Sequence, residues 1–155
     1  MKLNTRKCIK GAEQGNAKAQ SHHPSTRSHV KDAEKVDADG FKQYLQAAKQ
    51  GDSYAQCSLG LLYNSGCGGV KQNYVEASKW FRKAANQGLT EAQLRLGRAY
   101  IFGEGVVKNL KTAYGWLLLA SVGGDNEASA RVARLEKVLS TSQQQLAREW
   151  AIKKG

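Results

Sequence analysis

The stretch Ala-Gln-Cys-Ser-Leu-Gly-Leu-Leu-Tyr at residues 55–63 recurs as Ala-Gln-Leu-Arg-Leu-Gly-Arg-Ala-Tyr at residues 92–100, 37 positions further on. Both copies keep the alanine-glutamine pair, the leucine-glycine pair and the final tyrosine at the same spacing. Ala55, Leu59 and Tyr63 are four residues apart, which places them on one face of an α-helix. Self-similarity at a period of this length is typical of a helical repeat array.

The repeat extends to both sides of this stretch. Ala48-Lys49-Gln50-Gly51 precedes the first copy, and Ala85-Asn86-Gln87-Gly88 precedes the second. A similar motif stands further upstream at residues 12–20, and a weaker one follows at residues 124–128. After a glycine-rich stretch the copies realign at an offset of 36 residues, in the pairs Asn73 and Asn109, Ala77 and Ala113, Trp80 and Trp116, and Ala84 and Ala120.

Each unit is predicted to form two antiparallel helices. The first helix is expected at residues 53–64 and 90–102, and the second begins near residues 73 and 109. Glycine-rich loops at 66–69 and 103–105 connect them, where a positive φ is expected. Asn73 fits a helix N-cap, with Glu76 as the acid of a capping box. We assign structural roles in the repeat to Ala55, Leu59, Gly60, Tyr63, Ala77, Trp80, Ala84, Gly88, Ala92, Leu96, Gly97, Tyr100, Ala113 and Trp116.

The ordered motifs Ala-Gln-x-x-Leu-Gly-x-x-Tyr, Gly-x-Gly-Val and Ala-x-x-Trp-x-x-x-Ala-x-x-x-Gly resemble the Sel-one-like repeat family, a branch of the tetratricopeptide-like superhelices. The resemblance covers residues 46–155. It implies an all-α fold, an α/α superhelical solenoid of antiparallel helix pairs. Stacking buries the apolar face that a single helix pair leaves open.

The resemblance also suggests the domain organisation. Residues 41–155 are expected to form the solenoid, with repeats at about 53–88 and 90–124 and capping helices at about 125–154. Ser140 and Gln143 fit a capping box, and Trp150 is expected to pack the last helix onto the stack. Residues 1–40 read as a degenerate or partly disordered first repeat, because Pro24 interrupts the pattern. A decayed fragment of a longer array is a further reading.

No motif for catalysis stands in the sequence. The histidines His22, His23 and His29 lie close together, and a metal site formed by them with Cys8 is conceivable; solvated loop histidines are the favoured interpretation. We therefore assign no catalytic residue, metal or cofactor. The aromatic residues at matched repeat positions are interpreted as core instead of a ligand box.

A partner-binding surface follows from the resemblance, since tetratricopeptide-like arrays bind on the concave surface lined by their first helices. That surface would carry Tyr54, Ser58, Leu61, Arg95, Arg98 and Phe102. Ser58 and Leu61 are repeat-equivalent to Arg95 and Arg98, so packing does not dictate these positions. The two arginines, one turn apart, could hold a carboxylate or phosphate of a peptide, or could simply be solvated. The expected function is a non-enzymatic scaffold for a protein or peptide partner.

A cysteine-rich branch of the family binds or hydrolyses β-lactams, which gives an alternative function. The places of its cysteines hold Ala48, Gln56, Ala85 and Gln93 in this chain, so the sequence does not favour that activity. The three cysteines Cys8, Cys57 and Cys67 are expected to be thiols of a reducing compartment.

The formal net charge is +11 over 155 residues, which suits an acidic partner such as nucleic acid. The positive residues are scattered, however, and lack the aromatic interleaving of single-strand binders, so nucleic acid is not favoured. No stretch is apolar for long enough to span a membrane. The N-terminus shows no signal-peptide core, which predicts a cytoplasmic protein, or an exported one if the N-terminus has been trimmed. The sequence leaves the oligomeric state open.

Overall fold

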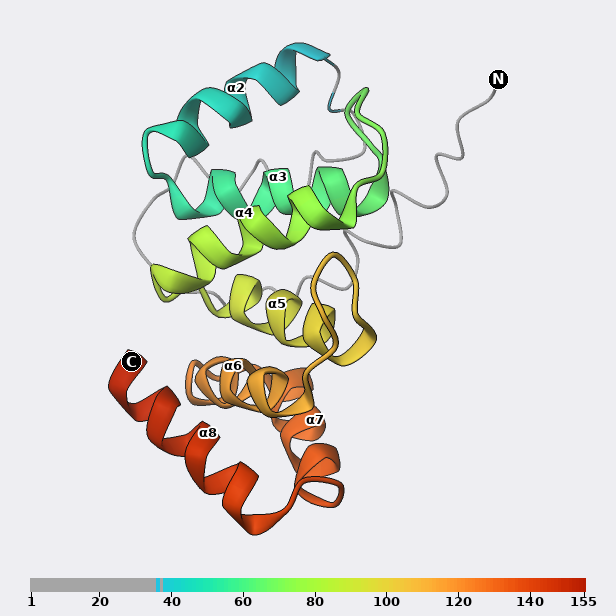
Figure 1. The fold of residues 1–155 in the computed structure, drawn as a ribbon. Coiled ribbons are helices and arrows are strands. Elements are labelled where there is room, and N and C mark those ends of the chain that lie inside the picture. The colour runs from blue at the N-terminus through green and yellow to red at the C-terminus, as the bar shows by residue number, and fades with distance from the viewer. Residues whose placement is uncertain (1–35, 37) are drawn as a thin grey trace.

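The computed structural model describes Val36 and residues 38–155. This part of the chain forms seven helices and no strand, so the predicted all-α class is confirmed. Figure 1 shows the helices following one another along the molecule from one end to the other. They are α2 (Ala38–Lys49), α3 (Ser53–Ser65), α4 (Tyr74–Asn86), α5 (Thr90–Phe102), α6 (Leu110–Val122), α7 (Asn126–Glu136) and α8 (Thr141–Lys154).

The helices pack in chain order as a solenoid. The pairs α3 with α4 and α5 with α6 make the most extensive contacts, and α4 packs on α5 as α6 packs on α7. The last helix departs from this order, because α8 returns to pack against α6. The first helices of successive units are thus α3, α5 and α7, while α2, α4 and α6 are second helices.

The ends of the helices follow the predicted chemistry, with one correction. Gly66 and Gly103 end α3 and α5 with φ of 75°, as expected of the glycine loops. The Asn73 side chain caps α4 by accepting hydrogen bonds from the amides of Val75 and Glu76. Glu76 forms no capping box, because its carboxylate pairs with Lys79 at 2.6 Å. The backbone N–H of Asn73 donates to the carbonyl of Tyr63 instead. The predicted box at Ser140 and Gln143 is formed.

The glycines inside the first helices allow close helix contact. A Cβ atom built on Gly60 would lie 2.5 Å from the Phe81 ring, and one on Gly97 would lie 2.7 Å from Leu117 Cγ. Phe81 and Leu117 are 36 residues apart and nearly inaccessible to solvent. The glycine therefore recurs because the second helix of the same unit occupies the space that a side chain would need. The close packing of the two helices offsets the low helix propensity of glycine.

The glutamine of the repeated alanine-glutamine pair joins each unit to the previous one. Gln56 and Gln93 are both buried. The Gln56 amide donates to the carbonyl of Ala48 in α2, and the Gln93 amide donates to the carbonyl of Ala85 in α4. These carbonyls lie in the last turn of a helix, where each also accepts a hydrogen bond from the backbone N–H of a following glycine, Gly51 or Gly88. The glutamine thus adds a second hydrogen bond to this carbonyl and fixes α3 on α2 and α5 on α4.

The core consists of three clusters along the stack, and each cluster contains residues from neighbouring units. Trp80 and Trp116 are buried in it. Of the residues with assigned structural roles, Tyr63 and Tyr100 are partly buried, and Gly88 is exposed with φ of 84° at the turn between α4 and α5. The others are buried.

The C-terminal helix is held by an aromatic and a polar contact. Trp150 packs edge-on against Trp116 with the ring centroids 5.0 Å apart, as predicted for this tryptophan. The buried Tyr114 hydroxyl donates to Glu136 Oε1 at 2.8 Å and accepts from Arg148 Nε at 3.1 Å. Arg148 also pairs with Glu136 at 2.8 Å. Tyr114, Glu136 and Arg148 therefore connect α6, α7 and α8.

This polar contact predicts an acid-dependent stability. The hydrogen bonds from Tyr114 and then Arg148 hold the pKa of Glu136 below its ordinary value of 4.5. A lowered folded-state pKa gives stability that is present above the ordinary pKa and is lost as pH falls through the folded one. We expect Glu136→Gln to reduce the free energy of unfolding at pH 7, with the difference from the wild type narrowing below about pH 4.5. Urea unfolding at pH 7, 5, 4 and 3 measures this. Glu149→Gln is the control, and a pH-independent difference for Glu136→Gln would contradict the assignment.

Two sequence expectations concern the cysteines and the N-terminus. Cys57 is a free, buried thiol. Cys67 is disulfide-bonded, which makes the expectation of three free thiols wrong for this residue. Several sequence expectations concern residues outside the described part of the chain. They are the first unit, which Pro24 interrupts, and the conceivable metal ligands His22, His23, His29 and Cys8.

Candidate partner-binding site

The residues predicted to bind a partner lie on α3 and α5 with very different accessibility. Tyr54 and Leu61 on α3 are partly buried and pack against the core cluster that contains Trp116. Ser58, at 8% exposed, offers little surface to a partner. Phe102, at the end of α5, is 58% exposed. The α3 part of this surface is therefore largely apolar and closed.

Arg95 on α5 is held in place by its own helix. Its Nε atom lies 2.6 Å from Glu91 Oε1, one helical turn earlier, and its side chain is only 10% exposed. Burial would lower the pKa of this guanidinium, but the charge of Glu91 and its hydrogen bond outweigh burial and raise it. Arg95 is thus a fixed, fully compensated cation.

Arg98, one turn further along α5, is less well compensated. Its nearest carboxylate is Glu127 on α7, at 3.9 Å, and the side chain is 28% exposed. Burial, followed by the positive charge of Arg95, lowers the pKa of Arg98, although Glu127 acts in the opposite direction. An arginine stays protonated under such a shift, so Arg98 is a partly buried cation whose ion pair with Glu127 is longer than the pair that holds Arg95.

A second copy of this arrangement on α7 escaped the sequence analysis. Glu127 pairs with Arg131 at 2.7 Å, one turn apart, as Glu91 pairs with Arg95. The segments Glu-Ala-x-x-Arg-x-x-Arg at 91–98 and 127–134 match at the 36-residue offset, which was the signal available in the sequence. Arg98 bridges the two pairs through Glu127. We call Glu91, Arg95, Arg98, Glu127 and Arg131 the charged ladder.

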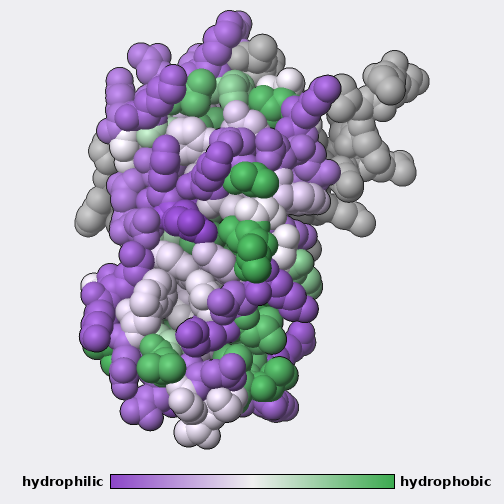
Figure 2. Space-filling view, in the orientation of Figure 1, coloured by the Kyte–Doolittle hydropathy of each residue, from purple (hydrophilic) through white to green (hydrophobic). Residues whose placement is uncertain are grey.

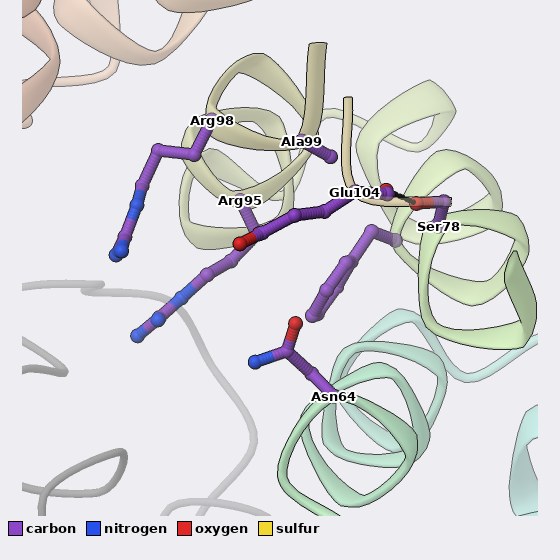
Figure 3. A pocket seen from close by; sticks show the side chains of 7 residues that line it. Asn64, Ser78, Arg95, Arg98, Ala99 and Glu104 are labelled. Atoms are coloured by element: carbon purple, nitrogen blue, oxygen red, sulfur yellow. Dashed lines mark hydrogen bonds between the residues drawn. The ribbon is translucent and has the colours of Figure 1, made fainter. Parts of the chain in front are cut away.

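A small hollow adjoins the charged ladder where α3, α4 and α5 meet. Asn64, Ser78, Phe81, Arg95, Arg98, Ala99 and Glu104 line it. Figure 3 shows the Arg95 and Arg98 side chains extending side by side in the same direction, with the Glu104 side chain crossing over α5 toward them. The Ser78 hydroxyl donates to the Glu104 carbonyl at 2.8 Å, which fixes the loop after α5 to α4. Tyr54, Ser58, Leu61 and Phe102 do not line this hollow.

The chemistry of the site suits binding. Burial, followed by the charge of Glu91, raises the pKa of the nearby Cys57 thiol to about 12, so it carries no thiolate at neutral pH. Among the described residues no group of three or more His, Cys, Asp or Glu side chains is placed to hold a metal ion. Guanidinium groups that share one direction can instead form paired hydrogen bonds to an oxyanion.

The remaining surface has no dominant apolar patch in the view of Figure 2, where hydrophobic residues form small groups within a mostly hydrophilic face. Large apolar side chains that are well exposed are dispersed over several helices and loops, for example Val107, Val122 and Ile152. None of the helices in the described part combines the length and apolar character needed to cross a membrane.

Comparison with known families decides what kind of solenoid this is. The model of the Sel1 repeat matches residues 53–89 and 90–125, which contain α3 with α4 and α5 with α6. Residues 53–125 form two Sel1 repeats. The predicted family and the predicted helical solenoid are thereby confirmed. Sel1 repeat proteins generally serve as scaffolds for protein interactions and are typically not enzymes.

Two solved structures are similar to this chain. A Sel1 repeat protein from Oxalobacter formigenes is 42% identical with a TM-score of 0.59, over 61% of this chain and 39% of that one. The protein c5321, a protective antigen present in uropathogenic Escherichia coli strains with an SLR fold, is 27% identical with a TM-score of 0.69, over 97% of this chain and 38% of that one. The chain thus spans less than half the length of either protein. No curated protein matches the sequence.

Proposed function

We propose that this chain is a non-enzymatic scaffold that binds a segment of a protein partner on the first-helix surface, formed by α3, α5 and α7. The observation that carries the proposal is the contrast between matched and unmatched positions of the repeat. Leu59 and Leu96 match and are fully buried, whereas Leu61 is replaced in the next unit by Arg98, whose side chain is 28% exposed. Residues that packing does not require are available for recognition.

The first-helix surface suits an extended or helical peptide more than a small molecule. Its hollow is small and lies between three helices, while polar side chains that could orient a ligand are spread along α5 and α7. Small-molecule sites are concave, mostly apolar and enclosed. A partner segment that crosses α3, α5 and α7 would contact Leu61, Arg98 and Arg131 in turn.

Affinity capture with matched variants tests this function. The full chain is immobilised as the wild type, as Arg98→Ala/Phe102→Ala, and as a control, Lys111→Ala/Val122→Ala, which removes one exposed cation and one exposed apolar residue from α6. We expect a protein from the native lysate to be retained by the wild type and the control, and at least about tenfold less by the α5 variant, since a few central residues dominate most interfaces.

Circular dichroism of all three proteins confirms that they are folded before capture. Equal retention by the three proteins would mean that binding uses another surface. No specific retention by the wild type would remove the scaffold function itself.

A further inference from the structure

We infer that the partner segment is acidic, and that a single aspartate or glutamate of that segment binds to Arg98 at the centre of the charged ladder. The inference rests on the proposed function, because it specifies the chemistry of the partner at the same surface. It depends on the charge balance of five side chains and on the position of one exposed aromatic residue.

The charged ladder contains three cations and two carboxylates. Glu91 is engaged by Arg95 at 2.6 Å, and Glu127 is engaged by Arg131 at 2.7 Å. Arg98 also lies near Glu127, but its Nη1 atom is 3.9 Å from Glu127 Oε1, which is longer than a direct hydrogen bond. Arg98 is therefore the one cation of the ladder without a ladder carboxylate at hydrogen-bond distance.

The remaining carboxylate nearby does not fill this role. Glu104 acts favourably on Arg98, but as the weakest of the influences on its pKa, and no ion pair joins the two side chains. Its loop is fixed by the hydrogen bond from Ser78. Among the described residues no carboxylate lies at hydrogen-bond distance from Arg98, so a partner carboxylate could bind it directly.

The same balance argues against a polyanion at this surface. A phosphate backbone would bring several negative charges close to Glu91, Glu104 and Glu127, all of which lie on the surface around the two arginines of α5. Like charges brought together at an interface are unfavourable. With three carboxylates already close to the arginines, a single partner carboxylate on Arg98 is favoured over a dianionic phosphoryl group.

An apolar contact beside the acid adds to the specificity. Phe102 lies one turn beyond Arg98 on the same helix and is 58% exposed. Residues four apart on a helix are neighbours on its surface. A partner carboxylate on Arg98 would thus place its flanking residue over the Phe102 ring, which favours an acidic residue followed or preceded by an apolar one.

The test uses a peptide array and the full-length protein. Each decapeptide carries a fixed central glutamate with an apolar neighbour and randomised flanks, and matched arrays replace the glutamate by glutamine or by phosphoserine. The wild type, Arg98→Gln and Lys111→Gln are compared, because both variants lose one positive charge and Lys111 lies exposed on α6. Circular dichroism verifies that each variant is folded.

We expect the wild type and Lys111→Gln to prefer glutamate over glutamine by about tenfold, as for a charge-assisted hydrogen bond, and Arg98→Gln to lose this preference. The inference is overturned by binding without an acidic preference, by a preference for phosphoserine, by a preference that survives in Arg98→Gln, or by no binding at all. Binding without acidic preference leaves the scaffold function intact. No binding to the array together with no specific capture from lysate removes both.

Discussion

Trp116→Ala is expected to lower the free energy of unfolding by about 3–5 kcal/mol, the range for deleting a large buried aromatic side chain. Trp116 is 4% exposed and packs in the cluster that joins α3, α4 and α5. It also carries the edge-on contact with Trp150 and lies under Lys154, whose Nζ is 5.5 Å from the ring centroid. One side chain thus holds the second unit to the first and to the terminal helix.

Urea unfolding followed by circular dichroism at 222 nm measures this loss without depending on tryptophan fluorescence. Trp150→Ala is the matched control, because Trp150 is 37% exposed and should lose clearly less. If Trp116→Ala does not fold, the smaller change Trp116→Phe is measured instead, with an expected loss of about 0.5–3 kcal/mol. Equal losses for Trp116 and Trp150 would mean that Trp116 acts only through the terminal helix.

Gly105→Ala is expected to destabilise the protein by about 3 kcal/mol through a backbone clash. A Cβ atom at this position would overlap the carbonyl of Tyr74 and lie 2.6 Å from the amide of Val75. These atoms form the beginning of α4, so the loop after α5 or the start of α4 would have to move. Gly105 also has φ of 71°, which disfavours a side chain by about 1–2 kcal/mol, and overpacking adds about 1–3 kcal/mol.

Gly69→Ala separates these two contributions. Gly69 stands in the corresponding loop of the previous unit with φ of 76°, but a Cβ atom there meets nothing within 4 Å. Its loss should be limited to about 1 kcal/mol from backbone conformation. Thermal and urea unfolding of both variants give the comparison. Similar losses would show that the contact between this loop and α4 contributes little.

The sequence predicted the parts of the fold that the repeat specifies twice. The first helix at 90–102 and the caps at Asn73 and Ser140 follow from local signals, namely a helical period, a glycine stop and a side chain that accepts amide protons. The structural role of Gly60 and Gly97 required two copies to be seen, since a single glycine within a helix is uninformative.

The features that sequence reasoning missed depend on contacts between elements. Glu76 turned to Lys79 because the Asn73 amide was already bonded to the carbonyl of Tyr63 in the preceding helix. Ser58 proved to be buried because helical periodicity does not show how deeply a neighbouring helix covers a position. The pairing of Arg131 with Glu127 lay within reach of the repeat offset, but its connection to Arg98 required the structure.

The hydrogen bonds from Gln56 and Gln93 have a consequence for how such an array can change in length. Each glutamine binds a main-chain carbonyl of the preceding helix, an acceptor that every residue provides. The joint between units therefore does not depend on which side chain the neighbour presents at that point. A unit can be duplicated, deleted or exchanged while this joint is kept, so that the recognition surface of the first helices can diversify without a new solution for assembly.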